Sequence, residues 1–98
     1  MLTITMNTDS PRKAVEILQD ALEKETLRLR YGLNLAGRRL KRFEKKYNVP
    51  SETFINEWAA EDLEGEDMEY VEWAGEYQFY AKLNQRLRIL EGIENVSS

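Results

Sequence analysis

The sequence predicts an all-α protein in which a long helix, a short helix and a third helix fold back as a helical hairpin. Three observations predict this class. Apolar residues recur at spacings of three and four from Val15 to Tyr47. A turn signal follows at residues 48–51. A second apolar stripe of the same spacing then runs from Tyr70 to Leu90, so two amphipathic helices can bury their faces against each other.

The chain is short enough to form a single helical domain over residues 1–98. Its two ends, residues 1–9 and 93–98, are expected to be flexible or, at the N-terminus, to form a short edge strand. Residues 2–7 alternate between apolar and polar side chains, which is the pattern of a strand. A second strand would be needed to complete it.

The long helix is predicted over residues 10–47. Ser10 is a good N-cap and Pro11 suits the first turn, where its missing N–H costs nothing. Such a helix is roughly 55 Å long and cannot bury its apolar seam alone, so we expect a homodimer if one chain cannot cover it. The seam consists of Val15, Leu18, Leu22, Thr26, Leu29, Leu33, Ala36, Leu40, Phe43 and Tyr47.

A strand at residues 27–35 is the alternative, because apolar and polar or small residues alternate strictly there. Gly32 and Gly37 each weaken a helix by about 1 kcal/mol. A strand followed by two short helices is the order of ribbon-helix-helix DNA-binding proteins. The helical seam continues through both glycines without a slip, which favours the long helix.

Residues 47–51 indicate that the chain stops one helix and starts another. Asn48 tolerates the left-handed conformation, Pro50 cannot continue a helix, and Ser51 can cap the next one. A short helix is expected near 51–62 and the third near 67–92, with Asp67 as its N-cap. The predicted core combines the aromatic residues Phe43, Trp58, Trp73, Tyr77 and Tyr80 with Leu33, Leu40, Leu83, Leu87 and Leu90.

Charge is separated along the chain: residues 28–46 hold eight bases and one acid, and residues 47–81 hold ten acids and no base. A basic stripe on the long helix can bind phosphates. The alternative is that these bases pair with the acids of the following segment, and the net charge of −4 argues against strong nonspecific nucleic-acid binding. The candidate nucleic-acid-binding residues are Arg38, Arg39, Arg42, Lys45 and Lys46.

The chain lacks histidine and cysteine, which excludes a disulfide framework and the usual zinc ligands. The acids near residues 62–69 do not have the spacing of an EF-hand loop, so a solvated acidic face is expected there. No catalytic residue, metal site or cofactor is therefore predicted, and we do not expect an enzyme. Without a signal-peptide or membrane-spanning pattern, a cytoplasmic location is the default.

The end of the long helix and the residues after it carry a recognisable motif. Residues 43–54 read FEKKYNVPSETF and are followed by Gly65, Asp67 and the pair Glu72-Trp73. This pattern resembles a group of small bacterial and archaeal antitoxin-like proteins, which have a long helix, a Phe-Glu-x-Lys-Tyr-Gly-Met-Ser-Ser-x-x-Phe motif, an acidic loop, and a Glu-Trp pair in a final helix. Asn48 and Pro50 replace its usual glycine and serine, and both are compatible with the same turn. The similarity covers roughly residues 27–92.

The resemblance implies a non-enzymatic antitoxin that neutralises a ribonuclease-like toxin. Because a ribonuclease binds a polyanion, acids and aromatic anchors can supply a complementary surface. There are two alternatives. One is a dimeric nucleic-acid-binding regulator that uses the basic stripe, and the other is a structural adaptor. The expected partner-binding residues are Trp58, Glu61, Asp62, Glu64, Glu66, Asp67 and Tyr70.

Overall fold

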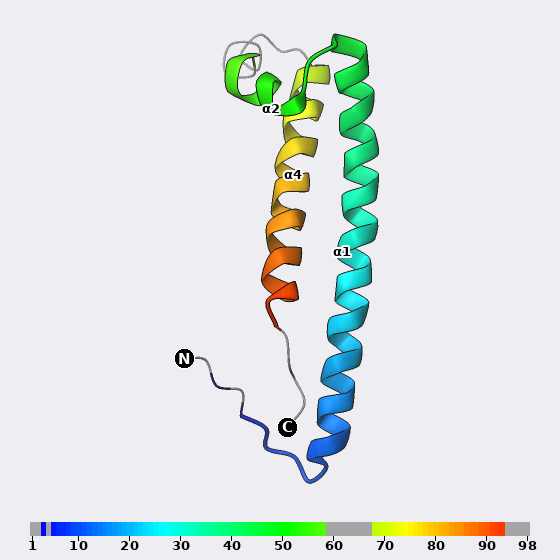
Figure 1. Ribbon diagram of the computed structural model, residues 1–98, viewed down its shortest axis with the longest axis vertical. Coiled ribbons are helices and arrows are strands. Elements are labelled where there is room, and N and C mark those ends of the chain that lie inside the picture. The colour runs from blue at the N-terminus through cyan, green and yellow to red at the C-terminus, as the bar shows by residue number, and fades with distance from the viewer. Residues whose placement is uncertain (1–2, 4, 59–67, 94–98) are drawn as a thin grey trace.

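The computed structural model describes residues 3, 5–58 and 68–93 of the chain. Its elements are the helix α1 (Pro11–Tyr47), the short helix α2 (Ser51–Thr53), the π-helix η1 (Phe54–Trp58) and the helix α4 (Met68–Glu91). Helix α4 runs back along α1 in a rod of 59 × 25 × 19 Å (Figure 1). The predicted all-α class and the packing of the third helix on the first are confirmed.

Helix α1 begins where the sequence predicts, with Pro11 at its first position. Ser10 holds the N-cap position as predicted, but its hydroxyl makes no capping hydrogen bond. Instead, the Ser10 N–H donates to Thr8 Oγ1 at 3.2 Å, and the Ser10 carbonyl accepts from the Ala14 N–H. Residues 3 and 5–7 form no strand, and the rest of the predicted strand pattern lies outside the described residues.

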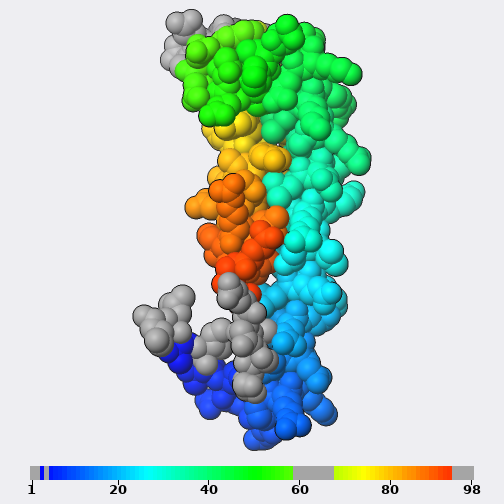
Figure 2. Space-filling view, in the orientation of Figure 1, coloured from blue at the N-terminus to red at the C-terminus, as the bar shows by residue number. Residues whose placement is uncertain are grey.

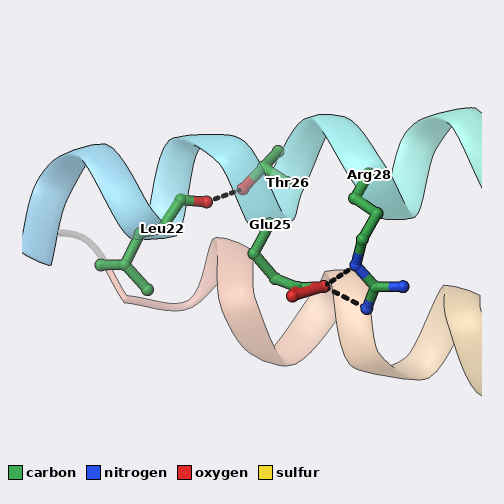
Figure 3. A network of polar contacts seen from close by, with 4 residues as sticks. All are labelled: Leu22, Glu25, Thr26 and Arg28. Carbon is green, nitrogen blue, oxygen red and sulfur yellow. Dashed lines mark hydrogen bonds and ion pairs between the residues drawn. The ribbon is translucent and has the colours of Figure 1, made fainter.

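Helix α1 continues without interruption through residues 27–35, so the alternative with a strand there is wrong. Gly32 lies close to α4: a β-carbon on it would be 2.9 Å from Leu83 Cδ1. The glycine therefore permits the close approach of the two helices at this level. Thr26 satisfies its hydroxyl within α1 by donating to the Leu22 carbonyl at 2.9 Å (Figure 3).

The turn after α1 forms as predicted at Asn48, which adopts the left-handed conformation with φ 55°. Ser51 does not cap the next helix, because Pro50 holds the N-cap position and Ser51 is the first helical residue. The Ser51 N–H donates to Glu44 Oε2 at 2.9 Å, and its buried hydroxyl accepts a hydrogen bond from Trp73. The capping group is thus the Glu44 carboxylate, which lies on the preceding helix.

The short helix predicted at 51–62 is α2 followed directly by η1, which ends at Trp58. Residues 59–62 and the predicted N-cap Asp67 lie outside the described residues. The space-filling view shows α2 and η1 packed against the ends of α1 and α4 at one end of the rod (Figure 2). This segment is therefore held by its contacts with the hairpin.

An aromatic cluster fills that end of the hairpin. Trp73 and Phe54 are fully buried, and their rings stack with centroids 3.9 Å apart and planes 3° apart. Phe43 and Tyr47 of α1 stack on Trp73, each at 5.5 Å. The predicted aromatic core is confirmed, because the remaining cluster members include Leu40, Trp58, Tyr70, Tyr77 and Tyr80.

A second, aliphatic cluster holds the other half of α4 against α1. Leu29, Leu83 and Leu87 are buried there, with Leu33 and Leu90 packed beside them. Helix α1 extends past the end of α4 in the direction of its own N-terminus (Figure 1). Along this extension Leu18 and Leu22 are only half-buried.

Replacing Trp73 with alanine is expected to lower the free energy of unfolding by about 3–5 kcal/mol, because a fully buried aromatic side chain leaves a cavity and loses three stacked neighbours. Leu27→Ala is the control, since Leu27 is 60% exposed and should cost less than about 0.5 kcal/mol. Urea denaturation followed by circular dichroism measures both. Equal effects of the two substitutions would contradict the central position of Trp73.

Candidate partner-binding surfaces

A groove of about 760 Å³ lies between α1 and α4 near the aromatic cluster. We call it the charged groove, because one wall is basic and the other is acidic. Phe43 and Gly75 contribute its uncharged lining, and a β-carbon on Gly75 would meet no atom within 4 Å. The charged lining residues are Arg39, Arg42 and Lys46 from α1, and Glu69, Glu72 and Glu76 from α4.

Two ion pairs cross the charged groove. Lys46 Nζ lies 2.6 Å from Glu69 Oε1, and Arg39 NH1 lies 3.0 Å from Glu76 Oε1. The expected pairing of basic residues with the acids of the following segment is therefore confirmed for Lys46 and Arg39. Because exposed ion pairs contribute little stability each, their main effect is to neutralise part of the predicted basic stripe.

All five predicted nucleic-acid-binding residues are exposed, and three of them, Arg38, Arg42 and Lys45, lie outside these two ion pairs. Their spacing of four and three places them on one side of α1. Within the described part of the chain, none of them forms an ion pair. We call these three residues the basic row.

Glu69 links the charged groove to the aromatic cluster. It accepts a hydrogen bond from Lys46 and a second one from the Tyr47 hydroxyl at 2.7 Å. The Lys46 hydrogen bond, followed by that from Tyr47, holds the pKa of the Glu69 carboxyl below its ordinary value of 4.5. Glu69 is thus kept ionised. An ion-pair partner has to be ionised, whereas a general acid has to be protonated.

A second groove of about 440 Å³ lies farther along the hairpin, and we call it the basic groove. Arg28 of α1 and Phe79, Lys82, Leu83, Gln85, Arg86 and Ile89 of α4 line it. The Arg28 guanidinium donates hydrogen bonds to the Glu25 carboxylate, which thereby positions Arg28 (Figure 3). The same hydrogen bonds lower the pKa of the Glu25 carboxyl.

An exposed stripe on α4 joins the two grooves. Its residues follow one another at alternating spacings of four and three, and every one is exposed. Met68 and Ile89 are 69% and 66% exposed, and Phe79 is 48% exposed. We call this set the outer stripe of α4: Met68, Glu72, Gly75, Phe79, Lys82, Arg86 and Ile89.

The predicted partner-binding aromatics belong to the core. Trp58 and Tyr70 are half-buried, and each contacts the ring of Phe54, at centroid distances of 6.3 and 5.2 Å. They also lie 6.2 Å from each other. The predicted acids Glu61, Asp62, Glu64, Glu66 and Asp67 lie outside the described residues.

Acids lie on each of the three elements that meet at this aromatic end of the hairpin. Glu52 of α2 and Glu57 of η1 are exposed, and Glu69 and Glu72 lie on the first turns of α4, against which Phe54 and its neighbours pack. We call these four residues the acidic end. Its acids lie on three elements, and the sequence alone could not show that these elements pack against one another.

Comparisons of the chain with protein-family models, with curated proteins and with solved structures give no match. Among the described residues, no helix is long and apolar enough to cross a membrane. The same residues contain no group of three acids that could hold a metal ion. The functional proposal therefore rests on the surfaces described above.

Glu69 predicts a specific pH dependence. Because its pKa is lower in the folded chain, ionised Glu69 stabilises the fold above about pH 4.5, and this contribution is lost as the pH falls below that value. The difference in unfolding free energy between wild type and Glu69→Gln should therefore be largest near neutral pH and shrink in acid. Urea denaturation from pH 7 to pH 3 measures it, with Glu52→Gln as the control. A difference that does not change with pH would contradict the role of Glu69.

Proposed function

We propose that this protein is a non-enzymatic binding protein that neutralises a cationic partner through its acidic end, and that the partner is a ribonuclease-like toxin. The observation that carries the proposal is that Glu52, Glu57, Glu69 and Glu72 lie on the three elements that pack together in the aromatic cluster. A protein that binds RNA carries a cationic surface, and an ordered set of carboxylates can compete for it.

The packing around the acidic end supports a binding role. Trp58 and Ile55 are half-buried, so part of each apolar side chain remains accessible among the acids. Apolar anchors within a charged rim are the usual arrangement of a protein-binding surface. By sequence, residues 61–67 add five further acids to the same segment.

The charged groove offers little for catalysis. Its lining consists of arginine, lysine, glutamate, phenylalanine and glycine. The pKa of Glu69 is lowered, whereas a general acid at neutral pH needs a raised value. Binding is therefore the better use of these side chains.

Reversing three acids of the segment tests this proposal. The variant Glu52→Lys, Glu57→Lys and Glu64→Lys reverses two acids of the acidic end and one of residues 61–67. It should bind the partner at least tenfold more weakly, because the acidic end then repels a cationic protein. The probe is the small basic protein retained by the tagged wild type from nuclease-treated host lysate. Far-UV circular dichroism should show unchanged helical content.

The matched control reverses Glu16, Asp20 and Glu23, three exposed acids on the far part of α1. It changes the net charge by the same amount without altering the acidic end. Undiminished toxin inhibition by the first variant, or equal losses in both, would overturn the proposed mechanism.

The basic row favours a second candidate function, a nucleic-acid-binding regulator. Arg38, Arg42 and Lys45 are exposed on one side of α1 and can each contact a phosphate. Affinity for promoter DNA should then fall with salt with a logarithmic slope of about −2.7 for three phosphate contacts. A gel-shift titration at several salt concentrations measures the slope, and the absence of any shift at low salt would exclude this candidate.

A further inference from the structure

The outer stripe of α4 reverses its charge about its centre. Glu72 lies on one side of Gly75 and Phe79, and Lys82 and Arg86 lie on the other. Within the described residues, neither Glu72 nor Lys82 forms an ion pair, although Glu69 and Glu76 on the same helix do. The stripe therefore presents an apolar centre flanked by unsatisfied charges of opposite sign.

The spacing of the outer stripe is that of a coiled-coil seam. Four and three alternate over three heptads, about 30 Å of helix. The opposite side of α4 already packs on α1 through Trp73, Leu83 and Leu87. Helix α4 thus carries two seams, and α1 covers only one of them.

We propose that a second copy of this chain covers the outer stripe, with the two α4 helices antiparallel about a two-fold axis. An antiparallel pair sets the acidic half of each stripe against the basic half of the other. A parallel pair would set Glu72 against Glu72 and Lys82 against Lys82, which is repulsive. Antiparallel self-association is therefore the arrangement that pairs these charges.

The space above Gly75 sets the register. A side chain of the second copy can occupy it, because no atom lies within 4 Å of a β-carbon at this position. Phe79 is the large exposed residue one turn away, so the ring of each Phe79 packs over Gly75 of the other copy. Counting outward from this contact, Glu72 of each copy faces Lys82 of the other.

Met68 and Arg86 fit the same register. Arg86 faces Met68 of the second copy, where its aliphatic stem covers the exposed thioether while the guanidinium stays in water. Burying a charge is costly unless the charge is paired. In the proposed dimer Glu72 and Lys82 form this pair across the two-fold axis. The charged groove and the basic groove, which both contain stripe residues, become the flanks of this interface.

The dimer has a consequence for partner binding. Glu72 of each acidic end pairs with Lys82 of the second copy, so Glu52 and Glu57 are acids of that end that lie outside the interface. The basic row on α1 does not belong to the outer stripe.

The mass in solution tests the interface directly. Sedimentation equilibrium of the wild type should give twice the chain mass. Gly75→Leu should raise the dissociation constant at least tenfold because its side chain fills the space needed by Phe79, while the helix tolerates leucine well. Ala81→Leu, at an exposed position of α4 that lines neither groove, should change it less than twofold. A wild type that stays monomeric at the highest concentration it reaches overturns the proposal.

Cross-linking tests the orientation of the two α4 helices. Because the chain contains no cysteine, every disulfide must come from the introduced cysteines. Glu72→Cys and Lys82→Cys chains, mixed and oxidised, should form a disulfide between unlike chains. Either variant alone should give little covalent dimer. Strong cross-linking of one variant with itself, or none in the mixture, overturns the antiparallel register. Neither experiment involves the toxin, so their outcome is independent of the proposed function.

Discussion

The contact of Trp73 with Phe54 and Ser51 is the interaction on which the arrangement depends. The Trp73 indole N–H donates to Ser51 Oγ at 2.8 Å, and both groups are buried. A buried indole N–H without an acceptor costs roughly 1–3 kcal/mol. This cost disfavours any movement of Ser51 away from Trp73. Since α2 and η1 together have only eight residues, they cannot be stable alone, and this contact fixes them on α4.

Charge separation along the chain becomes charge pairing across the hairpin. Three ion pairs join α1 to α4, at Lys46–Glu69, Arg39–Glu76 and Arg30–Glu91. All three are exposed, so the apolar clusters supply most of the stability, and the charges favour this register over others. Outside these pairs, Glu52, Glu57 and the charges of the basic row and the outer stripe are available to partners.

The sequence allowed the helices and the core to be predicted because both follow local rules. The seam from Val15 to Tyr47 predicted α1, and Asn48 and Pro50 predicted its end. Ser10 is the N-cap residue as predicted. The role of Ser51 was predicted wrongly, because the capping rule does not consider that another side chain can bind the same N–H. Ser51 binds Trp73, 22 residues away, and Glu44 takes over the capping role.

The candidate surfaces were less predictable. Tyr70 was expected to anchor a partner, yet it contacts Phe54 in the core. Trp58 was predicted both in the core and as an anchor, and it contacts Phe54 while it stays only half-buried. A pattern cannot tell a core aromatic from a surface one. The outer stripe was missed because Glu72, Lys82 and Arg86 occupy three of its seven positions. A pattern search restricted to apolar residues does not detect a heptad-spaced stripe in which several positions are charged.

Hydrogen exchange of the Trp73 indole proton tests most directly whether this contact holds the fold together. If it does, the proton exchanges only when the whole chain unfolds, with the same free energy as the amides of Leu29 and Leu87 in the second cluster. Nuclear magnetic resonance can follow these protons in one sample. Exchange of the indole proton through a local opening, at a much lower free energy than those amides, would contradict the account.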